Sequence, residues 1–348
     1  MTHKAGLGAD GARSRAGEEG APARDEPAGQ ETFPSQETLP GQEEPTARDA
    51  PRPPLQDLSY LRAVVDRRLG LLVPPPAIHP AALHAAMRHI LLAPGKRLRP
   101  LLAMAAALQL DASEHAVLDF GCALEMIHAA SLIMDDLPCM DDAATRRARP
   151  ATHVQFGEDV ALLAAIGLLS RAFGVAADAP GVNAEARLAA VSTLSLAVGS
   201  LGLSGGQLDD LRPASGRPVT VTEDVNRRKT GVLFSAAAEI AGRVAGADEA
   251  RRADLAAFAA HVGRAYQILD DILDGTASGA ALGKDVGKDA GRATVVAALG
   301  APAARTLLAE HLASAAAASR RIGPNDHGHE PLRLFLAAAF GELAPAGA

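Results

Sequence analysis

The segment SLIMDDLPCMDD, residues 131–142, places four carboxylates directly after an apolar run with the pattern of a buried helix. A second cluster, DDILD at residues 270–274, ends another apolar helical run. Carboxylates are hard oxygen ligands that suit Mg²⁺, which commonly binds phosphate oxygens together with one or two carboxylates. Two such clusters on apolar helices predict a metal-bridged diphosphate above an apolar cavity.

The spacing within the first cluster leaves its ligand pair open. Asp135 and Asp141 are six residues apart, which is roughly 240° around a helix at about 100° per residue, whereas Asp142 would align with Asp135. Pro138 between them removes a backbone donor and can kink or bulge the helix, which makes room for Asp141. Both Asp141 and Asp142 therefore remain candidates.

The second cluster has a simpler geometry. Asp270 and Asp274 are four residues apart, so a helix places them one turn apart on one face. A solvated acidic helix end is the ordinary alternative for either cluster alone. Two clusters, each on an apolar helix and with basic residues nearby, favour the metal site.

Composition limits the classes of function. The chain has 348 residues, 48% of them hydrophobic, which is ample for a large core. A net charge of −7 argues against a nucleic-acid surface. The two cysteines form no disulfide framework, which fits a reducing cytosol, and no signal peptide is recognisable. The charge-free run between Arg187 and Asp209 contains Ser, Thr and Gly, so a buried helix is expected there and no stable membrane insertion.

Local patterns divide the chain into two parts. Residues 1–54 are rich in Pro, Gly, Glu and Gln and poor in large apolar side chains, so we expect a disordered extension. Residues 55–348 are expected to form a single all-α domain, because no alternating strand pattern occurs and helical patterns follow one another. These patterns cover residues 55–72, 80–92, 101–110, 115–134, 159–177, 184–203, 222–245 and 250–273, with Ala-rich helices after them. Breaks are expected at Gly205-Gly206-Gln207 and around 212–218.

Two further features suit an anionic substrate. The loop at residues 93–100 brings Lys96, Arg97 and Arg99 to a helix start, where basic side chains and the helix terminus both favour phosphate. His128 lies seven residues before Asp135, on roughly the same helical face. An ordinary basic loop and a core histidine are the structural alternatives.

With both aspartate clusters in hand, the chain resembles the trans-isoprenyl diphosphate synthase family over about residues 80–345. The likeness rests on motifs in the expected order: GKRLRP at 95–100, DDLPCMD at 135–141 followed by Arg146-Arg147, KTG at 229–231, YQILDD at 266–271, DDILD at 270–274 and GKDVGKD at 283–289. Within that family it is most similar to bacterial geranylgeranyl diphosphate synthases of carotenoid pathways.

The resemblance implies a fold of roughly ten or more helices around a deep central cavity, usually as a homodimer in the cytoplasm. It also implies three Mg²⁺ ions, held mainly by Asp135, Asp141 and Asp270 with support from Asp136, Asp271 and Asp274. The allylic diphosphate would be bound by Arg146, Lys229, Thr230, Gln267 and Lys284, and isopentenyl diphosphate by Lys96, Arg99, His128 and Arg147. The implied reaction is a head-to-tail condensation of these two diphosphates.

The sequence departs from the family pattern at several positions. Met134 stands where members often have His, and Ala148 where Gly is common. Arg292 replaces a Lys near the second cluster; it keeps the charge, and we expect it to contact diphosphate. Cys139 is expected to be a bystander, because the reaction needs no thiol.

Product length depends on the pocket floor. In the family, residues upstream of the first aspartate form that floor, and Ala130 is small where farnesyl-type bacterial enzymes often carry an aromatic. An open floor suggests a C20 product. The alternatives are a farnesyl or longer-chain synthase, a terpene cyclase, whose second cluster is typically of another type, and a non-catalytic partner subunit, which usually lacks some of the aspartates or basic residues.

Overall fold

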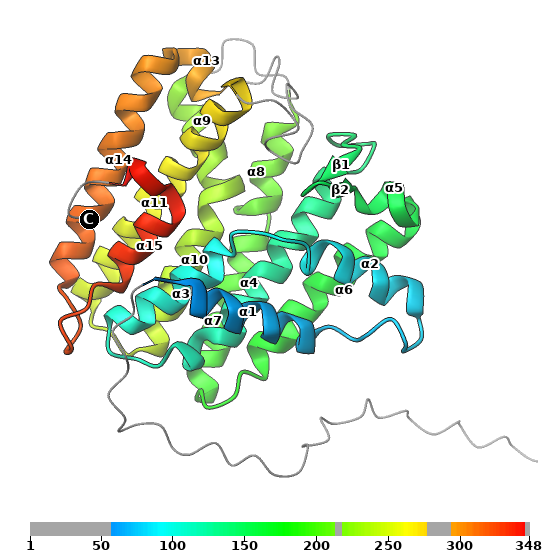
Figure 1. Ribbon diagram of the computed structural model, residues 1–348, viewed down its shortest axis with the longest axis horizontal. Helices are drawn as coiled ribbons and strands as arrows, with labels where there is room; N and C mark the ends of the chain where they lie inside the picture. The colour runs from blue at the N-terminus through cyan, green and yellow to red at the C-terminus, as the bar shows by residue number, and fades with distance from the viewer. Residues whose placement is uncertain (1–56, 213–217, 277–293, 345–348) are drawn as a thin grey trace, which may run out of the picture. The chain divides into compact units, whose positions relative to one another are not determined.

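The computed structural model describes residues 57–212, 218–276 and 294–344, all of which belong to one compact unit, residues 52–348 (Figure 1). The expected extension, residues 1–54, lies outside the described residues, so the boundary at residue 55 stays a prediction. Lys284, Arg292 and the GKDVGKD segment also lie outside them.

The described residues are almost entirely helical, which confirms the all-α class. The α-helices are α1 Ser59–Leu72, α2 Ala81–Leu91, α3 Leu98–Gln109, α4 Glu114–Asp135, α5 Thr152–Phe156, α6 Glu158–Ala177, α7 Ala184–Val198, α8 Leu203–Asp210, α9 Val219–Asn226, α10 Val232–Val244, α11 Glu249–Thr276, α13 Val295–Leu299, α14 Ala301–Ile322 and α15 Pro331–Phe340. A π-helix, η1, covers Arg227–Gly231, and a 3₁₀ turn, η2, covers Gly341–Leu343.

Helix α3 lies at the centre of the core, because every residue from Leu98 to Gln109 is buried. It packs against α4, α10 and α15. Helix α10 also packs against α4 and α11, the two helices whose C-terminal parts carry the aspartate clusters. Outer helices complete the arrangement, with α6 along α4 and α14 along α11 (Figure 1). This packing fixes the two aspartate helices relative to one another.

The sequence patterns predicted most helices correctly. The expected stripe of Leu58, Leu61, Val65 and Leu69 is buried throughout. The break expected at Gly205-Gly206 is wrong, because both glycines lie inside α8. Their missing side chains permit close packing instead, since a Cβ on Gly205 would lie 1.9 Å from the Ser200 carbonyl oxygen.

The helix expected over residues 222–245 is interrupted. Residues 227–231 form the π-helix between α9 and α10, so the KTG motif lies in an irregular turn. Single-turn π-bulges inside α-helices occur frequently at functional sites. No sequence pattern marked this interruption.

A short hairpin follows the first aspartate cluster. Strand β1, Thr145–Arg146, pairs antiparallel with β2, Arg149–Pro150, and they are the only strands among the described residues. The two turn residues, Arg147 and Ala148, both have positive φ, 53° and 57°. Two-residue hairpin turns of this kind favour Gly or Asn, which explains why the departure at Ala148 costs some backbone strain. The conformation of this turn sets the direction in which the Arg147 side chain points.

Three helical stretches are long and apolar enough to cross a membrane by length and composition: Glu114–Asp135, Glu158–Ala177 and Ala184–Asp210. The first is 78% buried inside the chain, but the others are only 39% and 28% buried. The expectation of a buried helix between Arg187 and Asp209 is therefore wrong for a single chain. Helices α6 and α7 leave an apolar face uncovered.

Candidate active site

The first aspartate cluster surrounds the end of α4. The helix ends at Asp135 and does not continue through Pro138 with a kink. The chain then folds back, so that the Asp141 amide donates to the Asp135 carbonyl oxygen at 2.9 Å. Asp142 is exposed and has φ 48°, whereas Asp141 is half-buried. This fold-back brings Asp141 beside Asp135, so the structure favours Asp141 over Asp142 as its partner.

The electrostatics of Asp135 fit a cation site. Its pKa is raised to about 6, chiefly by burial; the charge of Lys229 opposes this shift, and the charge of Asp141 contributes to it. A carboxylate held in this way is short of positive charge, which a bound cation would supply.

Asp136 has a different role from its neighbour. Its side chain is fully buried, and Arg146 donates to Oδ1 from Nε at 2.9 Å and from Nη2 at 2.5 Å. Burial raises the pKa of Asp136, and Arg146 opposes that shift. Asp136 therefore holds the Arg146 guanidinium beside the cluster.

Lys229 connects the first cluster to η1. Its Nζ donates to Asp210 Oδ2 at 2.6 Å. Burial alone would lower the pKa of Lys229, but the charges of Asp135 and Asp210 outweigh it, so the pKa lies above its usual value. Asp210 was not identified from the sequence; the Asp209-Asp210 pair, at the end of the interrupted apolar run, was the available signal. A Cβ on Gly206 would lie 2.6 Å from the Lys229 amide nitrogen, so this glycine lets α8 approach η1.

The second cluster is joined to η1 by hydrogen bonds. Thr230 Oγ1 donates to Gln267 Oε1 at 2.8 Å, and Gln267 Nε2 donates to Asp271 Oδ1 at 2.8 Å. Asp271 is buried and its other oxygen accepts from the Val295 amide at 3.2 Å. Asp270 and Asp274 lie one turn apart on α11 and are partly buried, as the spacing predicted. The structure thus brings both clusters to η1.

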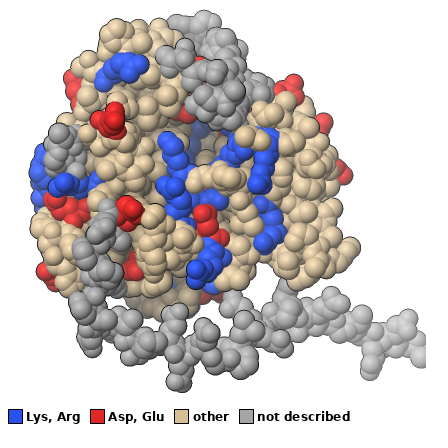
Figure 2. Space-filling model, viewed as in Figure 1, with Lys and Arg blue, Asp and Glu red and all other residues tan. Residues whose placement is uncertain are grey.

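Basic side chains gather around a hollow near the middle of the face shown in Figure 2. Arg99 is buried, with its Cζ 5.0 Å from the centre of the Phe234 ring, and its Nε has no hydrogen-bond partner. Arg147 donates to the Ile90 carbonyl oxygen at 3.2 Å. Burial and the nearby Arg99 hold the pKa of His128 well below its usual value, so the imidazole is neutral at pH 7. Arg99, Arg147 and neutral His128 offer N–H donors to an anion.

Of the basic loop, Lys96 is exposed and Arg97 has a structural role that the sequence did not reveal. Arg97 is 4% exposed and donates to Asp66 Oδ1, to Glu125 Oε1 and to the Ala93 carbonyl oxygen. Its charge is therefore neutralised within the protein, while Arg99, two residues on, makes no hydrogen bond or ion pair with the described residues.

Glu125 compensates the buried arginines. It is 2% exposed, lies 3.0 Å from Arg97 Nη1 and 3.7 Å from Arg147 Nη2, and its charge also acts on Arg99. We expect Glu125→Gln to lower the free energy of unfolding by about 3 kcal/mol, because breaking a buried pair leaves charge uncompensated. Chemical denaturation measures this.

Asp66→Asn is the matched control, because Asp66 pairs with the same Arg97 from a side chain that is 49% exposed. We expect a loss below about 1 kcal/mol there. Equal losses in the two variants would contradict the burial argument.

Gln207 and Ala130 are the remaining residues of interest for the candidate site. Both side-chain amide atoms of Gln207, on α8, are buried and have no hydrogen-bond partner among the described residues. The sequence predicted a break at this residue. Ala130 is fully buried on α4, five residues before Asp135. Its role as a pocket floor stays a prediction.

The donor set fits Mg²⁺ that is shared with a substrate. Among the described residues, no three His, Cys, Asp or Glu side chains form a complete metal site. Mg²⁺ keeps several waters and takes phosphate oxygens together with one or two carboxylates, so a pair such as Asp135 and Asp141 suffices on the protein side. The ligand assignments remain predictions.

Comparison with known proteins gives a consistent result. The sequence model of the polyprenyl synthetase family matches residues 80–322. The chain is 47% identical over 218 residues to the geranylgeranyl diphosphate synthase of Pantoea ananas, covering 61% of this chain and 71% of the relative. The corresponding enzyme of Pseudescherichia vulneris is 44% identical over 265 residues, covering 75% and 85%. The geranyltransferase of Helicobacter pylori, solved with magnesium and isoprenyl diphosphate, superposes with a TM-score of 0.71 at 26% identity, covering 82% of this chain and 95% of that one.

Proposed function

The chain belongs to the polyprenyl synthetase family, and from that premise we propose that it condenses isopentenyl diphosphate with allylic diphosphates to form geranylgeranyl diphosphate. It is a prenyltransferase that uses Mg²⁺. One observation supports the assignment: η1 is linked to both aspartate clusters, through the charge of Lys229 on Asp135 and through the hydrogen bonds from Thr230 to Gln267 and from Gln267 to Asp271. A substrate diphosphate beside η1 would meet both clusters at once.

The residues divide between two diphosphates. In this proposal Asp135, Asp141 and Asp270 would hold three Mg²⁺ ions, which would supply positive charge for the departing diphosphate. Lys229, Arg146, Thr230 and Gln267 hold the allylic diphosphate. Arg99, Arg147, His128 and Lys96 hold isopentenyl diphosphate.

The reaction follows from this separation. The C–O bond of the allylic diphosphate breaks, and both electrons leave with the diphosphate, whose charge Lys229 and Arg146 help to stabilise. The double bond of isopentenyl diphosphate attacks the allylic cation, and a proton then passes to the released diphosphate. The buried apolar helices exclude water that would otherwise capture the cation, and alignment of the two substrates supplies the rest of the acceleration.

The test is product analysis. Purified protein is incubated with labelled isopentenyl diphosphate and, separately, with C5, C10 and C15 allylic diphosphates. We expect a C20 product that requires Mg²⁺ and is lost on adding chelator. A C15 product would keep the reaction and exclude the C20 assignment. No condensation with any primer would favour a partner-subunit role.

The product-length hypothesis has its own variant. Ala130→Phe places an aromatic ring at the proposed floor, so we expect the main product to shorten from C20 to C15. The larger side chain also overpacks a buried position, at a cost of about 1–3 kcal/mol in stability. Ala129→Phe, at an equally buried neighbour that faces about 100° away, is the control for that cost. An unchanged C20 product from a folded Ala130→Phe variant would exclude Ala130 as the floor.

We also propose a cytoplasmic homodimer that supplies carotenoid or other isoprenoid synthesis. The uncovered face supports the dimer: Leu188 and Leu196 on α7 are 68% and 72% exposed, and Leu162, Leu163 and Ile166 on α6 are about half exposed. A contiguous apolar surface of this kind marks an interaction site. A second copy of the chain would cover it.

We expect Leu196→Glu to convert the dimer to a monomer, measured by light scattering after gel filtration, because a charge at the centre of an apolar interface is left unpaired. Leu299→Glu is the control, since Leu299 is 44% exposed on α13, which packs against α14, α11 and α9. A monomeric wild-type protein would contradict the dimer.

A further inference from the structure

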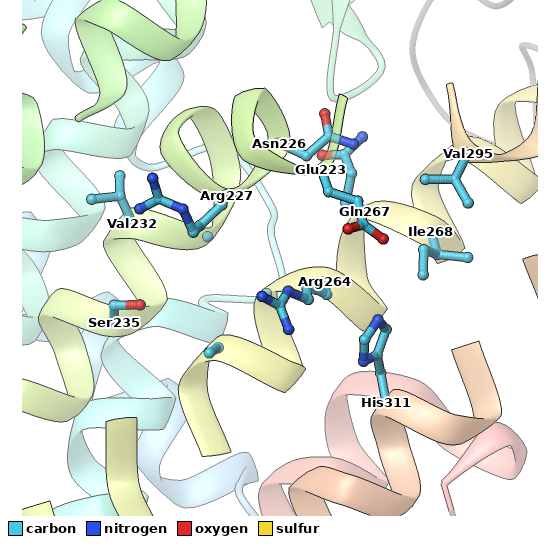
Figure 3. A pocket seen from close by; sticks show the side chains of 13 residues that line it. Glu223, Asn226, Arg227, Val232, Ser235, Arg264, Gln267, Ile268, Val295 and His311 are labelled. Carbon is cyan, nitrogen blue, oxygen red and sulfur yellow. The ribbon is translucent and has the colours of Figure 1, made fainter. Parts of the chain in front are cut away.

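A pocket separate from the aspartate clusters lies between η1, α10, α11 and α14 (Figure 3). It encloses about 700 Å³ of empty space, part of it open to solvent. None of the aspartates of either cluster is among the described residues that line it.

The interior of the pocket is apolar. Val232, Ile268 and Val295 line it, together with Ala260 and two glycines, Gly231 and Gly263. The glycines bring η1 and α11 into contact, because a Cβ on Gly263 would lie 2.9 Å from the Gly231 Cα. The two backbones therefore meet with no side chain between them, and together they form one continuous wall of the pocket.

The rim is rich in groups that bind anions. It carries Arg227, Arg264 and His311, with Glu223 as the acidic member (Figure 3). Arg227 is neutralised by Asp224, to which its Nη2 donates at 2.6 Å. The Arg264 guanidinium has no hydrogen bond or ion pair with any described residue. Figure 3 shows Arg264 and His311 on the same side of the space, below Gln267.

The histidine next to Arg264 lies in a partly buried setting with a second histidine. His311 Nδ1 lies 3.1 Å from His261 Nδ1, so one ring donates to the other and both cannot be protonated easily. Burial, His261 and Arg264 lower the pKa of His311 to about 4. A bound anion would neutralise Arg264 and relieve this repulsion.

We propose that this pocket binds an anionic amphiphile, with its apolar chain against Val232 and Ile268 and its phosphate or carboxylate head on Arg264. The site would also influence catalysis, because Gln267 lines the pocket and is hydrogen-bonded to both Thr230 and Asp271. An occupant that shifts Gln267 would change the affinity for the allylic diphosphate. This regulatory step rests on the proposed function, whereas binding does not.

Binding is tested on the full chain by calorimetry with dodecyl phosphate in the presence of chelator, which removes metal from the aspartate clusters. We expect saturable binding to the wild type, about tenfold or more weaker binding to Arg264→Glu, and no detectable binding to Ala260→Leu, which fills the pocket. Arg251→Glu, at an exposed arginine of the same helix outside the pocket, should bind like the wild type. Thermal melts establish that each variant is folded.

Two further measurements locate the ligand. Lys229→Met should bind dodecyl phosphate like the wild type if the ligand avoids the aspartate clusters. The NMR signal of His311 should titrate at higher pH when the ligand is bound. Wild-type affinity in both Arg264→Glu and Ala260→Leu, or loss of binding in Lys229→Met alone, would overturn the proposal.

The identity of the head group and the regulatory step are tested separately. If dodecanoate binds as tightly as dodecyl phosphate, the site accepts a carboxylate head group. If dodecanoate binds much more weakly, the site requires a phosphate head group. Inorganic phosphate binding as tightly as either amphiphile would overturn the role of the apolar chain. A protein that binds dodecyl phosphate but condenses no substrate would exclude the proposed function alone.

Discussion

Asp135→Asn is expected to lower kcat/KM about a thousandfold and, in chelator, to raise the stability of the folded protein. The first effect follows because Asp135 is a proposed metal ligand, and loss of several kcal/mol of charge stabilisation corresponds to roughly 10³ in rate. Steady-state assays with C15 allylic diphosphate and isopentenyl diphosphate measure it.

The stability effect follows from the raised pKa of Asp135. The pKa is about 6 in the folded protein against an ordinary value of 3.8, so the folded state holds a proton that the unfolded state releases between these values. Stability is therefore lost as pH rises through this window, and the loss persists at pH 7, on the order of 2–3 kcal/mol. Asparagine carries no charge and avoids this loss. The gain should vanish below about pH 4, where the wild-type carboxyl is protonated in both states.

Asp142→Asn is the matched control. Asp142 is exposed and directly follows the turn that ends at Asp141, so we expect less than about a tenfold loss of activity and no stability gain. A thousandfold loss in Asp142→Asn with near-normal activity in Asp141→Asn would reverse our choice between the two. Inactivity together with lowered stability in Asp135→Asn would indicate a structural role for Asp135.

The sequence predicted the fold class and the aspartate helices because these depend on short-range patterns. Apolar residues recur at helical spacing in α4 and α11, and the four-residue spacing of Asp270 and Asp274 fixes their common face. The choice between Asp141 and Asp142 could not be made in this way. It depends on a fold-back hydrogen bond from the Asp141 amide to Asp135, which no periodicity encodes.

The residues that were missed act through long-range contacts. Arg97 and Arg99 look alike in the sequence, yet only Arg97 reaches Asp66 and Glu125, which belong to other helices. Asp210 acquires its role from Lys229, 19 residues away, across the contact between α8 and η1. Gly205 was taken as a break because glycine usually weakens a helix, but here it allows close packing. In each case tertiary contact outweighed the local signal.

Lys229→Met is expected to lower kcat/KM for the allylic diphosphate about ten- to a hundredfold. The partly buried ammonium is a neighbour of Asp135, Asp141 and Asp210, and a charge-assisted hydrogen bond to a diphosphate contributes about 1.5–3 kcal/mol. Methionine keeps the apolar stem and removes the charge. The three carboxylates then lose their counter-charge, so the pKa of Asp135 should rise further and the activity optimum should move to higher pH.

The neighbouring residues separate this effect from simple disruption of the π-helix. Arg228→Met removes an adjacent cation of η1 whose partners are Asp209 and Asp224, so we expect a change within about threefold. Asp210→Asn leaves the ammonium in place but frees it, which should raise KM about tenfold with little change in kcat, because Asp210 acts only by positioning Lys229. Lys229→Arg retains charge without the same point-charge geometry and should restore part of the loss. Both Arg228→Met and Lys229→Met remove one cation from the same turn. If Arg228→Met lowered kcat/KM as much as Lys229→Met, the integrity of η1 and not the Lys229 charge would account for the loss of activity.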